Sequence, residues 1–459
     1  MSWMFRSVVV GIIAITAVLV YNKLFEVNIL PPLEEKWWGS GPVTNQPPKI
    51  TTKPIDFPQS ALDDLNFRLH HTKSFYPSLE GVKQYYGIHN TVLQNVFEYW
   101  KNQYNWTERL RFLNQYSHNF VQIRGLDVHF LHIKPNLTQG QNVKVLPLMM
   151  VHGWLSTFRE FYEVIPSLTQ PQKGKNFVFE LIIPSLPGFA FSEATRKPGL
   201  SPAYMAQIFK ELMDIVGFDR YYVYGGDWGS SVVTHLTARY PEKIIGMHST
   251  LCLNWSPLAH LMFVIGHFWP SLIYEENEVQ LSYNKQNTLM FVLEETGYFH
   301  IQGTKPDTVG VALRESPMGL AGYILEKVIT VTNPYFRDRE DGALTEKYTM
   351  EQILDNIMIY WLTESITSSM RIYAEALANF ELEFMILQKV HIYTPAGCAR
   401  FPYELSLTPR SILTKRLKNL VHLTQYDTGG HFAALEEPDL FANDLYLFAE
   451  KVENIKKSD

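Results

Sequence analysis

The sequence predicts an α/β fold: a doubly wound, mostly parallel sheet with a helical lid inserted into it and a helical extension before it. Two observations predict this fold. First, apolar runs typical of buried strands alternate with helical patterns over residues 119–256, and the alternation resumes over residues 385–459. Second, residues 257–384 between them are helical in pattern and rich in aromatic side chains, with no clear strand. A helical block inserted between strands is expected to cover their carboxyl ends, where ligands bind in this architecture.

The bulk composition is that of a globular protein with room for more than one domain. The 459 residues are 46% hydrophobic and 19% charged, and the net charge of -6 gives no reason to expect nucleic-acid binding. Cys252 and Cys398 are the two cysteines, too few for a dense disulfide framework and without the spacing of a zinc site. Whether they form one bridge depends on a proximity that the sequence does not show. No metal and no organic cofactor is expected.

Residues 1–25 are expected to form a single-pass membrane anchor. Residues 7–21 are uncharged and mostly apolar, and Arg6 and Lys23 flank them. Together with neighbouring apolar residues, this run nears the length that spans a thin bilayer. A cleaved signal peptide is the alternative interpretation, but no small-x-small cleavage site follows the run. The flanking charges are too evenly matched to indicate the orientation in the membrane.

Residues 26–118 are expected to form a linker and then a helical N-terminal region. The linker, residues 31–58, is rich in proline and polar side chains. Helices are expected from Ser60, which can cap the first of them, and over residues 91–103 and 107–115. This region is expected to pack on the domain that follows it.

The lid is expected to divide the sheet into two parts. The first part, residues 119–256, contains alternating and continuous apolar runs, and the second part is residues 385–459. Strands are expected over residues 121–123, 128–133, 143–151, 177–183, 221–224, 244–253, 389–393 and 420–423, and helices over residues 202–216 and 230–239.

A short turn between a strand and a helix carries the expected nucleophile. Residues 221–231 open as an aromatic and β-branched strand, break at two glycines and continue as a helix of small residues. Asp227 stands at the apex in the spacing Gly-x-Asp-x-Gly, typical of the strained turn that lifts a nucleophile above a parallel sheet. A carboxylate suits displacement at an sp3 carbon of an epoxide or alkyl halide, and water must then hydrolyse the resulting ester. Taken alone, the turn could equally hold Asp227 as a helix N-cap.

Hydrolysis of such an ester needs a histidine and an acid, which this topology places after late strands. Glu404 follows the expected strand at residues 389–393, and His431 lies in a Gly-Gly-His turn after the last strand. Asp227, Glu404 and His431 therefore satisfy the order nucleophile, acid, histidine. The rival acids are Asp427, Glu436 and Glu437.

Further motifs follow one another along the chain. They are Phe57-Pro58-Gln59-Ser60-Ala61-Leu62, His152-Gly153-Trp154, Gly225-Gly226-Asp227-Trp228-Gly229, Thr296-Gly297-Tyr298-Phe299-His300, Ser316-Pro317-Met318-Gly319, Arg371-Ile372-Tyr373 and Gly430-His431-Phe432. In these motifs, and over nearly its whole length, the sequence resembles the microsomal epoxide hydrolases and among them the insect juvenile hormone epoxide hydrolases. The resemblance implies an α/β-hydrolase fold, an anchor in the endoplasmic reticulum (microsomal) membrane, and the hydrolysis of a lipophilic epoxide, such as juvenile hormone, to a trans-diol.

The resemblance also implies a role for each site residue. Asp227 would attack the less hindered oxirane carbon while two lid tyrosines donate hydrogen bonds to the epoxide oxygen. His431, oriented by Glu404, would deprotonate the water that attacks the ester, and two backbone N-H groups would bind the oxyanion. The tyrosines are Tyr298 and Tyr373, and the N-H groups belong to Trp154 and Trp228.

One departure from the family pattern concerns the loop after Trp154. The family usually continues with Pro-Gly, whereas this chain has Leu155-Ser156. Leucine keeps the Trp154 N-H in place but does not fix the turn by itself, so activity or substrate range could differ. Two alternatives stay open: a haloalkane dehalogenase, for which Trp228 could bind halide, and a catalytically weak lipid-epoxide binding protein. The physiological substrate, the regioselectivity and the oligomeric state also stay open.

Overall fold

The structure is a computed structural model that describes residues 18, 21–26, 29–43, 47–137, 143–279 and 285–458. The apolar run expected to anchor the chain, residues 7–21, lies almost entirely outside them. Within the described part, no helix is long and apolar enough to cross a bilayer.

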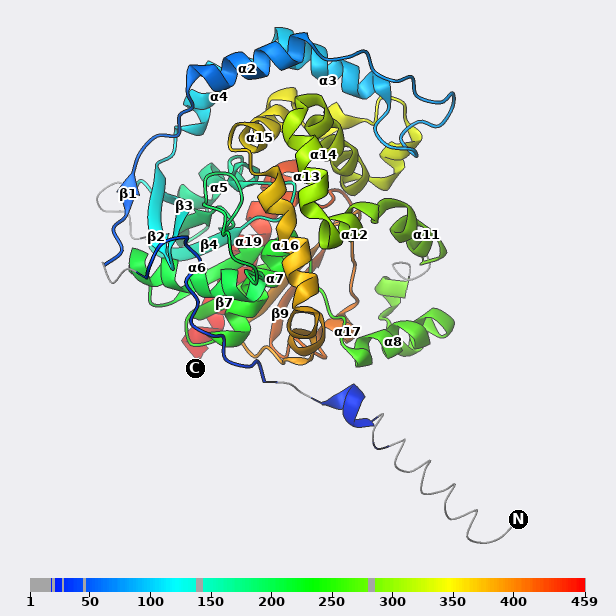
Figure 1. Ribbon diagram of the computed structural model, residues 1–459. Coiled ribbons are helices and arrows are strands. Elements are labelled where there is room, and N and C mark those ends of the chain that lie inside the picture. Colours follow the sequence, from blue (N-terminus) through cyan, green and yellow to red (C-terminus); the bar gives the residue numbers. More distant parts are fainter. Residues whose placement is uncertain are drawn as a thin grey trace.

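The described residues contain one nine-stranded sheet, in the order β1-β2-β3-β5-β4-β6-β7-β8-β9. Strands β1, β2, β3 and β5 pair antiparallel in succession, and β5, β4, β6, β7, β8 and β9 pair parallel (Figure 1). This confirms the predicted doubly wound, mostly parallel sheet. The strands are β1 (Thr51–Thr52), β2 (His118–Ile123), β3 (Leu126–Ile133), β4 (Lys144–Val151), β5 (Phe177–Pro184), β6 (Tyr221–Gly225), β7 (Ile244–Ser249), β8 (Ala396–Arg400) and β9 (Leu420–Gln425).

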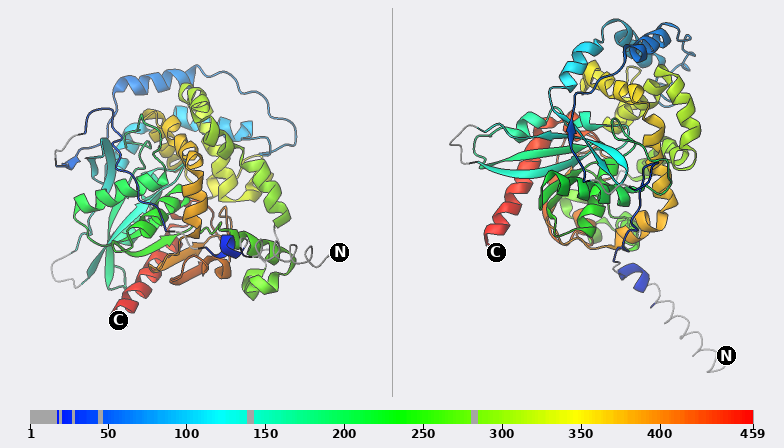
Figure 2. Two further views of the ribbon diagram at one scale, coloured as in Figure 1. Left: turned by 60° about the horizontal axis from the view of Figure 1, so that its bottom comes forward. Right: turned by 60° about the vertical axis from the view of Figure 1, so that its left-hand side comes forward.

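Helices cover both faces of the sheet, so the central strands can be apolar throughout. Helices α6 (Pro202–Val216) and α7 (Asp227–Arg239) pack together on one face, while α5 (Ile165–Thr169) and the C-terminal α19 (Pro438–Ser458) lie on the other (Figures 1 and 2). Every residue of β6 is buried. The strand order reverses at β4, and the carboxyl end beside such a reversal is where ligands bind in open α/β sheets.

The helices between β7 and β8 lie over the carboxyl ends of the strands and form the lid (Figure 1). Within the N-terminal region, α2 and α3 pack against lid helices α14 and α15. The lid helices are α8 (Pro257–Phe268), α9 (Pro270–Ile273), α11 (Lys285–Glu295), α12 (Gly297–Thr304), α13 (Pro306–Glu315), α14 (Pro317–Thr332), α15 (Met350–Leu362) and α16 (Ile366–Ala378), and the N-terminal helices are α2 (Gln59–His70), α3 (Asn90–Asn102) and α4 (Trp106–Leu113).

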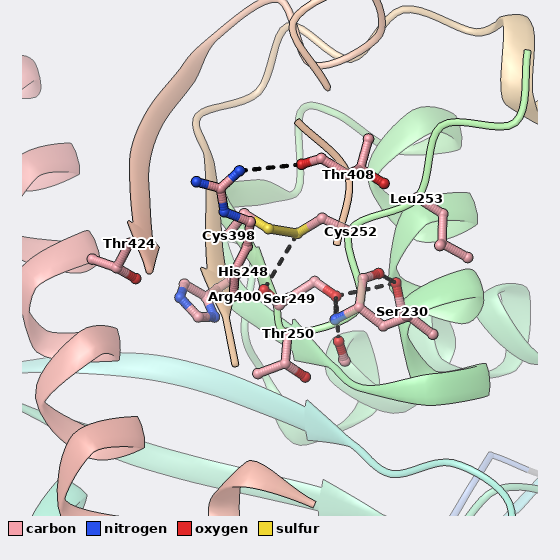
Figure 3. The surroundings of a disulfide bond; sticks show 12 residues. Ser230, His248, Ser249, Thr250, Cys252, Leu253, Cys398, Arg400, Thr408 and Thr424 are labelled. Carbon is pink, nitrogen blue, oxygen red and sulfur yellow. Dashed lines mark hydrogen bonds between the residues drawn. A yellow bond between two sulfur atoms is a disulfide. The ribbon is translucent and has the colours of Figure 1, made fainter. Parts of the chain in front are cut away.

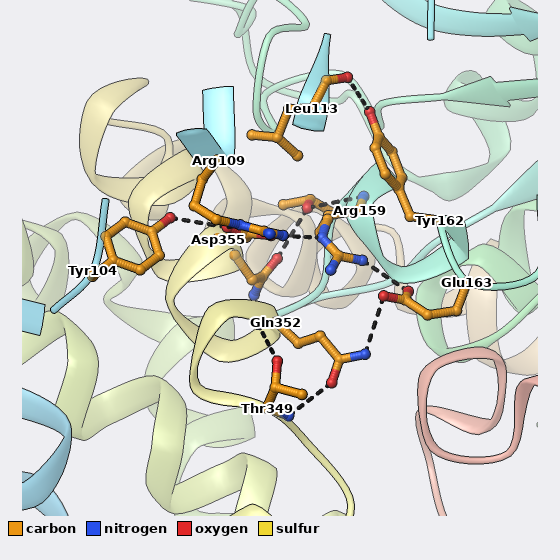
Figure 4. Close-up of polar contacts among 11 residues, drawn as sticks. Tyr104, Arg109, Leu113, Arg159, Tyr162, Glu163, Thr349, Gln352 and Asp355 are labelled. Carbon is orange, nitrogen blue, oxygen red and sulfur yellow. Dashed lines mark hydrogen bonds and ion pairs between the residues drawn. The ribbon is translucent and has the colours of Figure 1, made fainter. Parts of the chain in front are cut away.

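One buried carboxylate ties the N-terminal region, the sheet and the lid together. Asp355 of α15 is fully buried and accepts hydrogen bonds from Tyr104 and Arg109 at the N-terminal region (Figure 4). It also accepts a 2.9 Å hydrogen bond from Arg159, which lies in the 3-10 helix Phe158–Phe161 after β4. The loop between β4 and Arg159 contains Trp154, one of the predicted site residues. The network therefore fixes the position of the lid relative to that loop.

The predicted strand at residues 389–393 is wrong. Leu387–Lys389 is a 3-10 helix, and Ile392 makes only an isolated bridge to Leu417. The strand between β7 and β9 is β8, which is buried throughout and consists of four small residues and Arg400. A Cβ at Gly397 would come within 2.6 Å of the Phe448 side chain, so packing against α19 demands a small residue there. Small residues have low strand propensity, which hid this strand in the sequence.

Other boundaries differ more modestly. Helix α7 begins at Asp227 and not at residue 230, and β7 ends at Ser249, short of the expected residue 253. The short β1 pairs with β2 inside the stretch expected to be a linker. Cys252 and Cys398 form a disulfide that joins the segment after β7 to β8 (Figure 3).

Candidate active site

The turn between β6 and α7 holds Asp227 in a strained backbone conformation. Its φ is +47°, in the left-handed region that non-glycine residues seldom occupy. Glycines make room for the turn: a Cβ at Gly229 would come within 2.2 Å of the Val151 carbonyl oxygen, and one at Gly153 within 2.3 Å of the Asp227 side chain. The turn thus brings the carboxylate against the loop after β4.

The Asp227 carboxylate contacts two predicted site residues through different oxygens. Its Oδ1 accepts a 2.7 Å hydrogen bond from the backbone N-H of Trp154, and its Oδ2 lies 3.4 Å from Nε2 of His431. The N-H of Trp228 lies in the first turn of α7, where backbone N-H groups lack partners within the helix. The structure therefore shows the Trp154 donor in contact with Asp227, and the role of the Trp228 N-H stays a prediction.

Glu404 lies in the loop after β8, and its carboxylate is buried beside the histidine. Glu404 Oε1 lies 2.6 Å from Nδ1 of His431. Burial alone would lower the pKa of His431, but the negative charges of Glu404 and Asp227 and the hydrogen bonds to them hold this pKa well above its usual value. The structure thus brings Asp227, His431 and Glu404 into one chain of contacts.

Both predicted lid tyrosines lie at the same place, Tyr298 on α12 and Tyr373 on α16. Tyr298 stacks on Trp154 with ring centroids 5.4 Å apart, and Tyr373 packs edge-on against Trp228 at 4.9 Å. Burial, followed by the charge of Asp227 or the partner tyrosine, raises the pKa of each phenol. Both hydroxyls therefore remain protonated near neutral pH and are available as hydrogen-bond donors.

The departure at Leu155-Ser156 has a structural explanation. Leu155 has φ +60°, which a proline ring cannot adopt. Instead of a proline, lid helix α15 fixes the turn: the Asn356 side chain donates to the Leu155 carbonyl oxygen, and the Tyr360 hydroxyl donates to that of Ser156 at 2.9 Å. The rigidity expected from a proline is supplied by contacts from the lid.

Two buried glutamates lie near Asp227, His431 and Glu404. From the sequence, Glu436 was considered only as a rival catalytic acid, and Glu160 was not identified. Glu436 accepts the backbone N-H groups of Gly430 at 2.7 Å and Phe432 at 2.8 Å, on either side of His431. Glu160, in the 3-10 helix after β4, is buried behind Ser156. Burial raises the pKa of each carboxyl to about 7. The position of Glu436 shortly after the Gly-Gly-His turn could have indicated its role from the sequence. No feature of the sequence indicated a role for Glu160.

A buried His-Asp cluster lies beneath the sheet and away from the triad. His248 Nε2 and His422 Nε2 lie 2.7 Å and 3.1 Å from the carboxylate of Asp444. That carboxylate also accepts from Thr424 and Tyr426. Because Asp444 is already occupied by four donors, we interpret the cluster as a hydrogen-bonded link between α19 and the sheet.

The chain matches the family described as "Epoxide hydrolase N terminus" over residues 50–161 and the family described as "alpha/beta hydrolase fold" over residues 147–275. It is 42% identical over 465 residues to juvenile hormone epoxide hydrolase 1 of Ctenocephalides felis, with 99% of each chain covered. It is 39% identical to epoxide hydrolase 1 of Oryctolagus cuniculus, with 92% of this chain and 94% of that protein covered. The chain belongs to the epoxide hydrolase family.

Solved epoxide hydrolases share the fold as well. The crystal structure of the Bombyx mori juvenile hormone epoxide hydrolase superposes with a TM-score of 0.88 at 41% identity, covering 92% of this chain and 99% of that chain. The Aspergillus niger epoxide hydrolase gives a TM-score of 0.71 at 26% identity, covering 88% and 97%. The predicted α/β-hydrolase fold and family resemblance are confirmed, and family membership favours an epoxide hydrolase over a haloalkane dehalogenase.

Proposed function

We propose that this epoxide hydrolase opens a lipophilic terpenoid epoxide of the juvenile hormone type through a covalent ester on Asp227. The observation that carries the proposal is the position of the Asp227 carboxylate, which accepts the Trp154 N-H, lies 3.4 Å from Nε2 of His431 and is near enough to two lid tyrosines that its charge raises the pKa of both. Relatives of this chain are named juvenile hormone epoxide hydrolases, which supports the substrate class.

In the first step, a carboxylate oxygen of Asp227 forms a C-O bond to an oxirane carbon, and the bond between that carbon and the ring oxygen breaks. The electron pair passes to the ring oxygen, which takes a proton from Tyr298 or Tyr373. Without such a donor the leaving group would be a strongly basic alkoxide. The backbone N-H of Trp154 holds Oδ1, which leaves Oδ2 facing His431.

In the second step, His431 Nε2 takes a proton from water as the water oxygen attacks the ester carbon of Asp227. The oxyanion that forms is stabilised by the N-H groups of Trp154 and Trp228. Collapse of this intermediate breaks the ester C-O bond, and the imidazolium gives its proton to the departing alkoxide, which leaves as the diol. The Asp227 carboxyl group then loses its proton to the deprotonated tyrosine, which restores both side chains. Glu404 stabilises the imidazolium and orients its ring.

The proposal also includes the expected location. We infer an anchor in the endoplasmic reticulum (microsomal) membrane from the apolar residues 7–21. The full chain should remain in the membrane pellet after alkaline carbonate extraction, whereas a variant lacking residues 1–25 should lose that resistance. Equal extraction of both would remove the anchor from the proposal.

A single-turnover experiment with His431→Gln tests the chemistry. With a juvenile-hormone-like epoxide, the variant should accumulate an adduct of substrate mass on the tryptic peptide 221–239, while wild type releases diol. His391→Gln is the matched control, because that histidine lies on a partly exposed loop outside the triad, and it should turn over as wild type does. Binding without adduct or diol in either protein would favour the catalytically weak binder, and halide release from a bromoalkane without diol formation would favour the dehalogenase.

A further inference from the structure

Helix α8 has no charged residue, although one of its faces is exposed. Ala259, Met262 and Gly266 form its buried stripe. The stripe at Leu261, Val264 and Phe268 faces solvent, with Val264 57% and Phe268 65% exposed. A surface helix of a soluble protein normally presents polar side chains on its outer face. The outer face of α8 is mostly apolar, and its exposed polar side chains are His260 and His267.

The exposed stripe continues into α9. Trp269 is 60% exposed and Leu272 is 70% exposed. We call Leu261, Val264, Phe268, Trp269 and Leu272 the α8–α9 face. Contiguous apolar surfaces of this kind mark contacts with another apolar phase.

The α8–α9 face is held rigidly. On the opposite side, Ala259 and Met262 of α8, Tyr274 after α9 and Ile412 of α17 (Arg410–Leu413) form a hydrophobic cluster of their own. Ser256 caps α8 by accepting the N-H of Ala259 at 3.2 Å. The apolar side chains are therefore presented outward by a packed support.

The N-terminal segment leaves the protein on the same side. Residues 21–25 are helical, and Figure 1 and the left view of Figure 2 place this helical turn on the side of the molecule that carries α8 and α17. Glu26 pairs with Lys389 at 3.1 Å, which fixes the exit point. The uncharged run at residues 7–21 comes just before Glu26 in the sequence. A bilayer into which this run inserts would therefore lie close to the α8–α9 face.

Basic side chains lie on and just after α17, the short helix that packs on the inner side of α8. Arg410 begins α17, and Lys415 and Lys418 follow that helix. All three are exposed. Arg410 lies 3.8 Å from the exposed Glu275, and the two lysines form no ion pair with any acid of the described residues. Lysine and arginine beside an apolar surface favour anionic lipid headgroups.

We propose that the α8–α9 face is a second membrane contact, which inserts at the boundary between the headgroups and acyl chains of an anionic bilayer. It lies in the plane of that boundary and does not span the bilayer. The contact holds the lid against the phase into which a lipophilic epoxide partitions. The contact does not depend on the proposed chemistry.

Spin labels measure the insertion directly. Both native cysteines are in the disulfide, so an introduced cysteine is labelled selectively. Full-chain Val264→Cys, Phe268→Cys and Leu272→Cys are compared in phosphatidylcholine-phosphatidylserine vesicles with Val311→Cys, whose parent residue is 68% exposed on α13. Labels on the face should gain accessibility to oxygen and lose accessibility to a water-soluble nickel reagent, and the label at residue 311 should stay water-exposed. Water-like values at all four positions overturn the proposal, and so does spin-spin broadening without lipid, which would indicate a second copy of the chain.

A kinetic arm uses the double variant Val264→Glu/Phe268→Glu with Val311→Glu as control. The KM for an epoxide dissolved in vesicles should rise about fivefold or more, because the introduced charges weaken the binding of the α8–α9 face to the bilayer. The turnover of a water-soluble epoxide should stay unchanged. Equal kinetics for the double variant and the control would contradict the membrane contact, as would an equal loss on both substrates. If the wild type proved inactive, the proposed function would fail while the spin-label result still decided the membrane contact.

Discussion

Nε2 of His431 lies 3.4 Å from Oδ2 of Asp227, so the imidazole sits between this carboxylate and that of Glu404. In the resting enzyme, the two negative charges hold the pKa of His431 high. Formation of the ester on Asp227 removes one of these charges. The pKa of His431 should then fall, which makes the imidazole a base at the step that needs one.

Asp227→Asn should therefore lower the pKa of His431. The substitution keeps the size of the side chain and removes its charge, as the ester does. An NMR titration of the His431 ring protons measures the effect, with Asp307→Asn, an exposed carboxylate on α13, as the control. An unchanged His431 pKa would mean that Glu404 alone sets it.

Tyr298→Phe and Tyr373→Phe should each slow ester formation by about 100-fold, the typical contribution of one positioned proton donor. The double variant should lose more, because in the proposed mechanism either hydroxyl can donate to the epoxide oxygen. Trp154 and Trp228 pack against the two rings, so single-turnover tryptophan fluorescence can follow the step. Tyr323→Phe is a control next to Trp154, and a similar loss in that variant would indicate a packing defect.

Leu155→Pro should reduce the rate of ester formation. Proline cannot adopt φ +60°, so the turn must change its conformation and move the Trp154 N-H. Asn356→Ala should do the same by releasing the turn, at a cost of about 1–3 kcal/mol for the buried carbonyl left without a partner. Stopped-flow kinetics of both variants provide the measurement. Wild-type rates in both would show that the turn needs neither constraint.

Glu436→Gln should lower turnover about tenfold, because the N-H groups that flank His431 bind different carboxylate oxygens and the variant replaces one of these oxygens by an NH2 donor. Burial raises the Glu436 pKa from 4.5 to about 7, so its ionisation costs the folded state on the order of 3 kcal/mol as the pH rises through this range. The variant should therefore melt higher than wild type at pH 8 but not at pH 4.5. Glu450→Gln, an exposed glutamate, should change neither property.

Asp355→Ala should destabilise the protein by about 3–5 kcal/mol, because it leaves Arg109 and Arg159 without their buried counter-ion. Asp307→Ala removes an exposed partner of Arg371 and should cost less than about 1 kcal/mol. Thermal melting compares the two. Equal shifts would place the Asp355 network among ordinary surface pairs.

The residues of the candidate site could be selected from the sequence because each carries a local signal. Asp227 stands in a glycine-flanked turn, and His431 follows two glycines after the last strand. Parallel strands then bring these turns to one edge of the sheet. Glu404 was selected for the same reason, although the strand before it was placed several residues too early.

What the sequence did not show depends on contacts between distant residues. The small residues of β8 form a strand because they pair with β7 and β9, and Phe448 leaves room only for a small residue at Gly397. Likewise, the turn at Leu155 depends on Asn356 of α15, some 200 positions later, and nothing at residue 155 indicates that partner. Long-range packing overrides local propensity at both places.

The disulfide joins Cys252 and Cys398, which are 146 positions apart in the chain, and the whole lid lies between them. A protease that cuts once in the lid therefore leaves two fragments that stay covalently joined. On a non-reducing gel the nicked enzyme would migrate as one species, and only reduction would separate its halves. The lid can be opened by cleavage without being lost from the enzyme.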